Sequence, residues 1–276
     1  KQIGKGEEGV IYMDDFEGTR APIDLRFPFI SWTLASTPRK SPNQFNSIMF
    51  PEAELNNDLN YNNNRAKLSW YNIESVLQER GNPNNPYRNN LDELSKPEVR
   101  QVFQNEIFPK RSVEFGQGLL TTFDIHFQPK EKGPYNFEYR NTRVNGNGTL
   151  LNPRNAWGGI MRNIDQIDFE TGNVEFIEAW VQDPFYGNPS STGGELYINL
   201  GNISEDILRD GKRMYENGLP TTSAPNIPVD TNTVWGKVPA NPLQVTNAFT
   251  NNIDERVQQD VGLDGLNDTE EKTKQK

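Results

Sequence analysis

Acid–base chemistry in this chain would depend on one histidine and many carboxylates. His126 is the only histidine, so a serine–histidine–aspartate triad would have to use it. It lies in the middle of a regular alternating segment, where a histidine is commonly an outward-facing polar residue. A catalytic base must also lie within reach of a nucleophile. We therefore expect His126 to be a surface residue of a strand.

Paired carboxylates would suit glycoside hydrolysis, in which one acts as acid and the other as nucleophile or base. The chain has 38 acidic residues, so such pairs arise freely, and solvated surface or turn roles are the expectation. The candidates lie within or beside expected strands and are Asp14, Asp15, Glu17, Glu175, Glu178 and Asp183.

A segment near the end of the chain partly matches the calcium loop of EF-hands. Its third position is Gly262, which has no side-chain oxygen, so an acidic linker with turn glycines is the alternative interpretation. The sequence does not decide between a calcium loop and an acidic linker, and no metal or cofactor is predicted. The residues at loop positions with ligand or turn roles are Asp260, Asp264, Gly265, Asp268 and Glu271.

Tryptophan rings on a surface would stack on sugars, although tryptophan is more often a core or interface residue. Trp32, Trp70 and Trp180 lie in strand-like segments and are expected in the core. Trp157 and Trp235 lie beside glycine in expected loops, so they are the better candidates for a binding surface.

Composition excludes several classes of function. The 276 residues carry a net charge of −10, which argues against binding to nucleic-acid phosphates or anionic lipid. The chain has no cysteine, which excludes disulfides, thiolate chemistry and cysteine-ligated metals. The hydrophobic fraction of 33% is low, and about one residue in eight is asparagine, so many loops over a limited core are expected. No stretch approaches the length of a membrane helix.

Short alternating segments predict a mostly β chain. In 119–128 the series of odd-numbered residues is apolar or threonine and should face a core. The segments expected as strands are 10–13, 29–35, 66–71, 119–128, 174–181 and 195–200.

A few helices are expected between these strands. Ser95 and Ser204 are expected N-caps of helices over 96–108 and 204–216, and shorter helices are expected over 73–80 and 252–259. The segments 51–65 and 81–90 read as asparagine-rich loops, and 219–245 as irregular.

This pattern predicts a β-sandwich or jelly roll with helical insertions and long asparagine-rich loops. The segment 13–18 looks like the start of galactose-binding-like jelly rolls, and the strand ending at Trp180 looks like a core strand of that fold. We expect one such domain over 1–218, followed by an irregular segment, a short helix and a charged tail over 219–276.

Blocks along most of the chain resemble an interior segment of the SprA/Sov family. The order and spacing of the blocks together carry the resemblance. They are 64–73, 133–137, 152–160, 177–185, 196–208, 233–239 and 259–265.

The resemblance implies a role in the type IX secretion system of Bacteroidota. Members of this family form a giant outer-membrane β-barrel that carries folded cargo, gliding adhesins included, to the cell surface. The implied partners are the rest of the barrel, a PorV-type barrel, a plug protein and cargo with a C-terminal sorting domain. The few clear strands and long polar loops suit an extramembrane segment, and domain-sized insertions in such barrels favour the extracellular side. The implied role is gating or shielding at the pore exit, without chemistry.

Two alternatives come from other classes of protein. A carbohydrate-binding module would explain the jelly-roll-like start and the loop tryptophans Trp157 and Trp235. A glycoside hydrolase would explain only the abundance of carboxylates.

Overall fold

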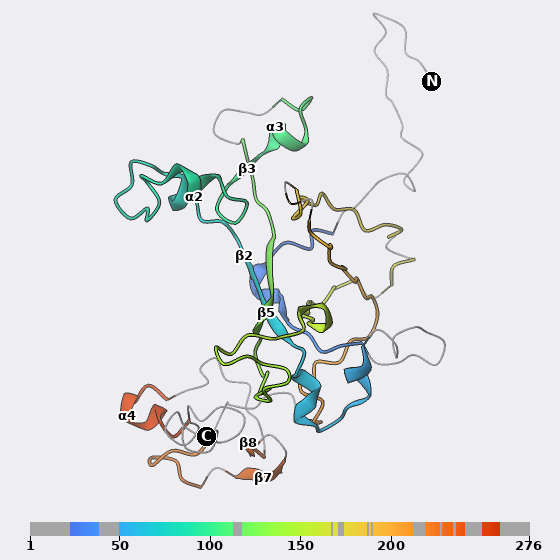
Figure 1. Ribbon diagram of the computed structural model, residues 1–276, viewed down its shortest axis with the longest axis vertical. Coiled ribbons are helices and arrows are strands. Elements are labelled where there is room, and N and C mark those ends of the chain that lie inside the picture. Colours follow the sequence, from blue (N-terminus) through green and yellow to red (C-terminus); the bar gives the residue numbers. More distant parts are fainter. Residues whose placement is uncertain are drawn as a thin grey trace, which may run out of the picture. The chain divides into compact units, whose positions relative to one another are not determined.

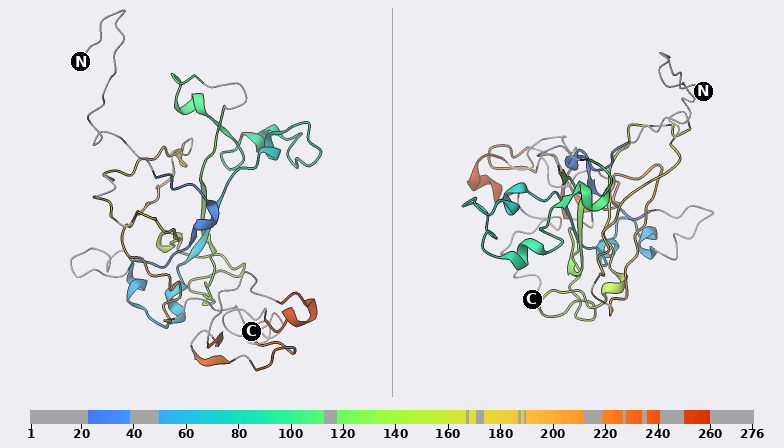
Figure 2. Two further views of the ribbon diagram at one scale, coloured as in Figure 1. Left: turned by 180° about the vertical axis from the view of Figure 1, so that it is seen from behind. Right: turned by 90° about the horizontal axis from the view of Figure 1, so that it is seen from above.

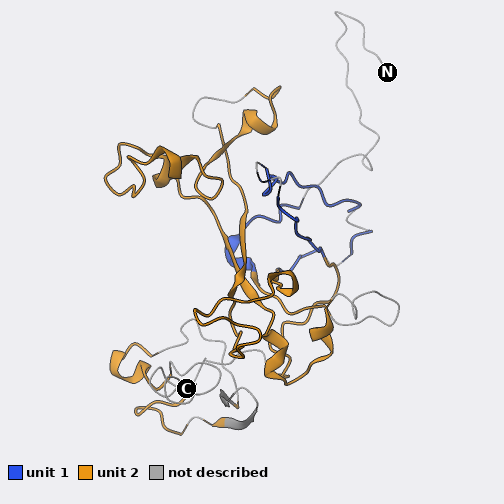
Figure 3. Ribbon diagram, viewed as in Figure 1, with its two compact units in different colours: residues 1–32, 162–198 blue, residues 33–161, 199–276 orange. Residues whose placement is uncertain are grey.

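The computed structural model shows a mostly β chain with short strands and few helices (Figure 1). The structure describes residues 23–38, 50–112, 118–166, 168–170, 174–186, 188, 190–211, 219–226, 228–233, 236–240 and 250–259. The chain divides into two compact units (Figure 3). Unit 1 comprises 1–32 and 162–198, and unit 2 comprises 33–161 and 199–276.

The strands of the described residues pair two by two, and all four pairs are antiparallel. The coarse expectation of a mostly β chain is confirmed. The pairs are β1 (Thr33–Leu34) with β6 (Ile160–Met161), β2 (Ala66–Tyr71) with β5 (Asp124–Lys132), β3 (Val102–Phe103) with β4 (Leu119–Leu120), and β7 (Val229–Thr233) with β8 (Gly236–Pro239).

The ribbon of β2 and β5 is the longest paired element, and it can be followed from both sides in Figures 1 and 2. The strand predicted over 66–71 is confirmed. Leu68 lies opposite Phe127 and Trp70 opposite Ile125, so these side chains share one face of the ribbon. The register shifts between Ala66 and Lys67, where β5 contains Pro129. Proline has no amide to donate, which is why it is tolerated at such irregular positions.

The single strand predicted over 119–128 is only partly right. β4 ends at Leu120, and β5 begins at Asp124 and runs on to Lys132. Three residues without strand structure separate the two, because β4 pairs with β3 whereas β5 pairs with β2.

The helix predicted over 96–108 is wrong. Helix α2 (Leu91–Ser95) ends before it, and only α3 (Gln104–Ile107) falls within it. Lys96 has extended backbone, as expected for a residue before a proline, and β3 pairs with β4 instead of continuing a helix. Ser95, expected to cap the helix over 96–108, is instead the last residue of α2, and the side chain of Asn90 caps α2 by accepting the amide of Glu93 at 3.2 Å.

Other expected helices are short or missing. The segment 73–80 forms one 3-10 turn, Ser75–Gln78, and 204–211 forms no helix in its described part. Helix α4 (Ile253–Arg256) confirms a short helix within 252–259, and the side chain of Asn252 caps it. The loops 51–65 contain two 3-10 turns, Pro51–Glu54 and Leu59–Asn62.

Two predicted strands and one irregular segment are also corrected. The segments 174–181 and 195–200 form no strand, because a strand needs a bonded neighbour and the described residues supply none. The segment 219–245, expected to be irregular, contains the hairpin of β7 and β8.

The strand expected over 10–13 lies outside the described residues. Within 29–35 only β1 is a strand, preceded by the 3-10 turn Phe29–Ser31.

The buried apolar clusters of unit 2 are small. Leu208 is fully buried and packs with Leu59, Phe137 and Ile207. Ala66 packs with Val144 and Leu150, which form an isolated bridge around an exposed turn. Polar groups must therefore supply much of the packing in this unit.

Candidate functional site

Four of the blocks that carry the family resemblance meet in unit 2. Trp157 donates its amide to the carbonyl of Asn64 at 2.9 Å, and Ala66 donates to the carbonyl of Trp157 at 2.8 Å. Gly133 donates its amide to the carbonyl of Arg65 at 3.0 Å. The guanidinium of Arg65 also reaches the carbonyl of Ile207 at 3.5 Å. Segments about 140 residues apart in sequence therefore share one bonded network.

Arg65 is the centre of this network and is only 1% exposed. Its Nε donates to Asn62 Oδ1 at 2.7 Å, and its Nη1 donates to the carbonyl of Ala35 at 2.9 Å. The guanidinium lies 4.3 Å from the centroid of the Trp157 ring, a cation–π contact. No carboxylate of the described residues lies within ion-pair distance. Burial therefore lowers the pKa of Arg65 to about 10, which still leaves it charged at neutral pH.

Arg209 lies close to the same segments and is 3% exposed. It donates to the carbonyls of Ala53 and of Thr37, the latter at 2.6 Å, and lies 5.2 Å from the centroid of the Tyr61 ring. The Tyr61 hydroxyl accepts the amide of Thr37 at 2.7 Å. Arg209 has a φ of 56°, so its backbone occupies the left-handed region.

Gly133 and Asn136 explain why the block 133–137 has its residue types. A Cβ on Gly133 would lie 2.3 Å from the carbonyl oxygen of Ala66, so only glycine fits. The side chain of Asn136 donates to the carbonyls of Asn63 and Arg65, at 3.2 and 2.7 Å, and accepts the amide of Glu138 at 3.0 Å. The side-chain amide of Asn136 thus satisfies backbone groups that have no partner in a strand ladder.

Glu138 provides the buried negative charge at the edge of the network. Its side chain is 1% exposed and lies 2.5 Å from Arg140 and 3.6 Å from Arg143. Burial acts to raise the pKa of Glu138, but the hydrogen bonds and charge of Arg140, with the charge of Arg143, outweigh it and lower the pKa below its usual value. The carboxylate is therefore ionised at neutral pH and serves as an ion-pair partner.

His126 lies exposed on β5, as expected. The register places it directly opposite Ser69, and Asp124 lies two residues away on the same face. The structure therefore brings the three residue types of a triad together on an open ribbon. No hydrogen bond joins His126 to either of them. Burial raises the pKa of Asp124, which accepts a hydrogen bond from the Thr122 hydroxyl at 2.7 Å instead.

The other catalytic candidates do not assemble into a site in the described residues. Glu175, Glu178 and Asp183 are exposed, and Asp183 accepts the amide of Phe185 at 2.8 Å in a local turn. Asp14, Asp15 and Glu17 lie outside the described residues, as do all the residues from Asp260 to Glu271. Within the part of the chain that the structure describes, no cluster of three metal-ligating side chains occurs.

The tryptophans differ from expectation in both directions. Trp180, expected in the core, is 74% exposed. Trp157, expected at a surface, is half-buried and packs on Arg65 and Tyr61. Trp32 and Trp70 are half-buried, and Trp235 lies outside the described residues. The glycines that follow Trp157 in the sequence correctly indicated a loop. The sequence did not indicate the contact of the indole with Arg65, because Arg65 is distant in sequence.

No protein-family model matches the chain, and no curated protein matches it either. Among the described residues no helix has the length and apolar character needed to cross a membrane.

Proposed function

We propose that this chain is an extramembrane segment of a SprA/Sov-type translocon, the outer-membrane barrel of type IX secretion and gliding motility. Its role is structural, in gating or shielding the pore exit on the extracellular side, and involves no chemistry of its own. The partners are the rest of the barrel, a PorV-type barrel, a plug protein and cargo with a sorting domain.

The observation that carries the proposal is the convergence of the resembling blocks. The blocks 133–137 and 152–160 each bond to the block 64–73 through their main chains, and Arg65 reaches Ile207 in a fourth block. Residue types shared with a family are expected where a fold depends on them. Here the close carbonyl of Ala66 requires glycine at Gly133, and Arg65 is buried with the ring of Trp157 stacked on its guanidinium.

Exposed apolar side chains in the block 177–185 and at the start of the block 196–208 support membership of a larger assembly. Trp180 is 74% exposed, Val181 73%, Leu196 76% and Ile198 62%. Monomeric soluble proteins rarely expose contiguous apolar patches of more than a few hundred Å². We infer that other parts of a longer protein cover these segments.

The finer fold that we propose is a β-sandwich of the jelly-roll, galactose-binding-like type. The antiparallel ribbon of β2 and β5 supports it, because a sandwich is built from antiparallel sheets. A sheet of a sandwich requires β2 or β5 to gain a further strand neighbour, and hydrogen exchange on the parent protein tests this. Slow exchange at every amide of one of these strands is expected, whereas slow exchange at only alternate amides of both would contradict the sandwich.

An antibody against this fragment tests the function on intact cells of the source organism. A parent many times larger than the fragment, in the outer membrane and cut by added protease, is the expected result. A large outer-membrane parent that is cut only after the envelope is opened would move the segment to the periplasm or the lumen. A small parent outside the membrane would overturn the proposal.

A carbohydrate-binding module is the second candidate, and the 74% exposure of Trp180 favours it. Binding on a glycan array that is lost in Trp180→Ala would support this function. Ile253→Ala is the matched control, because Ile253 is an apolar residue with the same 74% exposure and has no ring to stack on a sugar. No binding by the unmodified protein would dismiss the candidate.

A further inference from the structure

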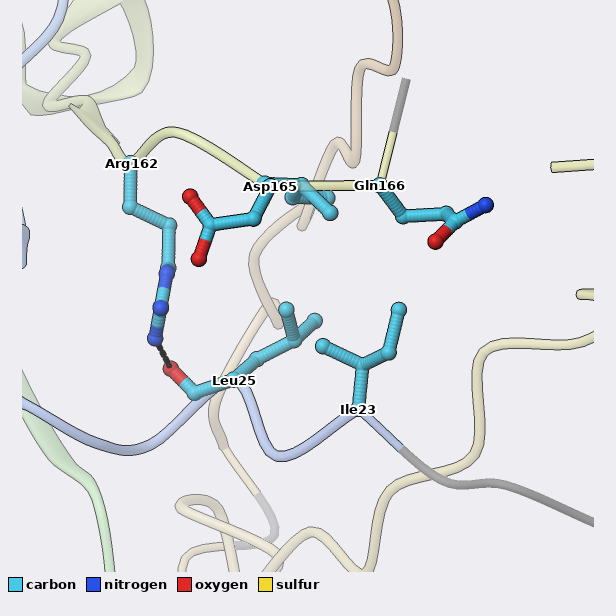
Figure 4. Close-up of a pocket in the computed structure, with 6 residues that line it drawn as sticks. Ile23, Leu25, Arg162, Asp165 and Gln166 are labelled. Carbon is cyan, nitrogen blue, oxygen red and sulfur yellow. Dashed lines mark hydrogen bonds between the residues drawn. The ribbon is translucent and has the colours of Figure 1, made fainter. Parts of the chain in front are cut away.

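A cavity of about 310 Å³ lies in unit 1, between the segments 23–25 and 162–166 (Figure 4). This volume is at the lower end of the ~300–1,000 Å³ range of small-molecule sites. Three aliphatic and three polar residues line the cavity, namely Ile23, Leu25, Ile164, Arg162, Asp165 and Gln166.

Arg162 is held in a fixed orientation at one side of the cavity. Its Nη1 donates to the carbonyls of Leu25 and Phe27, at 2.7 and 2.8 Å. Its guanidinium also lies 5.8 Å from the centroid of the Trp32 ring, whose Nε1 donates to the same Leu25 carbonyl at 2.9 Å. The Nη2 of Arg162 makes no hydrogen bond to a described residue. A preorganised guanidinium thus keeps donors for an anionic group.

Asp165 supplies the opposite charge in the same cavity. Its carboxylate points toward the Arg162 side of the cavity in Figure 4. No ion pair joins the two side chains, and within the described residues Asp165 has no other cationic partner. The cavity therefore presents one cation and one anion that do not neutralise each other by contact.

The aliphatic residues form the apolar part of the cavity. Ile23 and Leu25 project from their segment toward the wall that carries Asp165 and Gln166 (Figure 4). A ligand would therefore contact branched aliphatic side chains and both charges at once. Burial of an aliphatic group against them removes apolar surface from water and so favours binding.

We propose that this cavity binds a small zwitterion with a branched aliphatic side chain, namely a free α-amino acid such as leucine. Its carboxylate pairs with Arg162, its ammonium pairs with Asp165, and its side chain contacts Ile23, Leu25 and Ile164. The opposite charges of the cavity sum to zero, as do those of the ligand. The proposal is independent of the function proposed above.

Saturation-transfer NMR with L-leucine tests the site on the whole chain. Saturable binding with a Kd of roughly 1 mM is expected, because the ligand is small and the cavity open. Asp165→Asn, at an exposed position, should weaken binding roughly tenfold without affecting folding, because a charged partner is lost. Arg162→Gln should weaken it at least as much. Arg154→Gln is the control, because Arg154 is an exposed arginine of unit 2.

Two analogues separate a free amino acid from a peptide end. N-acetyl-leucine resembles a C-terminal residue, and leucine amide resembles an N-terminal one. Each lacks one charge and should bind roughly tenfold more weakly than leucine. Absence of saturable leucine binding would overturn the proposal. So would an affinity for leucine that is unchanged in Asp165→Asn, or an analogue that binds as tightly as leucine.

Discussion

Arg65 carries its charge in the interior of unit 2 against a side-chain amide, main-chain carbonyls and the face of Trp157. Removing a guanidinium from water costs several kcal/mol, and only a full set of partners offsets that cost. Each of the three guanidinium nitrogens of Arg65 donates to an acceptor on a different segment. At the residue scale, the geometry of the guanidinium therefore contributes more to the stability of unit 2 than its charge does.

Arg65→Lys should therefore destabilise the protein although the charge is kept. Lysine cannot match the planar fork of donors, so we expect a loss of about 2–4 kcal/mol in the free energy of unfolding. Urea unfolding followed by tryptophan fluorescence measures it. Arg154→Lys is the exposed control and should stay within about 0.5 kcal/mol of the unmodified protein. Equal stability of the two variants would contradict the role given to Arg65.

Gly133→Ala should destabilise by steric conflict alone. The added Cβ would lie 2.3 Å from the carbonyl oxygen of Ala66, which is backbone and cannot swing away. We expect a loss of about 1–3 kcal/mol, typical of overpacking. Gly146→Ala is the matched control, because nothing lies within 4 Å of its Cβ and its φ is not positive. Thermal unfolding of both variants decides the point.

Glu138 should make stability depend on acid pH. Because the pKa of Glu138 is lowered in the folded state, its stabilising contribution is present above the ordinary value of 4.5 and is lost as pH falls through the folded pKa. Glu138→Gln should thus be less stable than the unmodified protein at pH 7, and the difference should shrink below pH 4.5. Glu54→Gln, at an exposed position, is the control for urea titrations across this range. A difference that is constant with pH would refute the ion-pair role.

At the scale of the elements, the ribbon of β2 and β5 organises unit 2. Gly158 packs so closely on it that an added Cβ would lie 3.0 Å from Leu68 and 3.2 Å from Phe127. The hydroxyl of Tyr71 at the end of β2 lies 3.4 Å from the carbonyl of Glu98, and Gln78 donates to the carbonyl of Val99 at 2.8 Å. One face of the ribbon therefore holds the loop around Trp157, and its far end meets the segment after α2.

Leu68→Ala should destabilise more than Ser69→Ala on the opposite face. Leu68 is half-buried between Phe127 and Gly158, whereas Ser69 is exposed. We expect a loss of about 1–2 kcal/mol for Leu68→Ala, less than for a fully buried leucine, and less than about 0.5 kcal/mol for Ser69→Ala. Urea unfolding measures both, and similar losses would contradict the assigned faces of the ribbon.

At the scale of the whole molecule, the chain combines a net charge of −10 with exposed apolar segments. The charge favours solubility, whereas the segments around Val181 and Ile198 favour association. Both Val181 and Ile198 belong to unit 1, and the described residues leave their side chains 73% and 62% exposed.

The isolated chain should consequently self-associate as its concentration rises. The double substitution Val181→Glu with Ile198→Glu should reduce association, because it places charge on both exposed segments. Analytical ultracentrifugation measures the effect. Asn188→Glu with Ser190→Glu adds the same charge at exposed polar positions nearby and serves as control. Sedimentation as a monomer at every concentration would contradict the exposed-surface argument.

The sequence by itself determined those features that local residues control. The strand-like segments predicted the strand at Ala66–Tyr71 and a mostly β chain, and a capping asparagine accompanied the short helix at Ile253–Arg256. Tertiary structure alone decided that Val102–Phe103 pairs with Leu119–Leu120 and that Arg65 lies buried against Trp157. Each of these depends on a partner distant in sequence, and a local pattern carries no information about which distant segment will supply the hydrogen bonds or the ring.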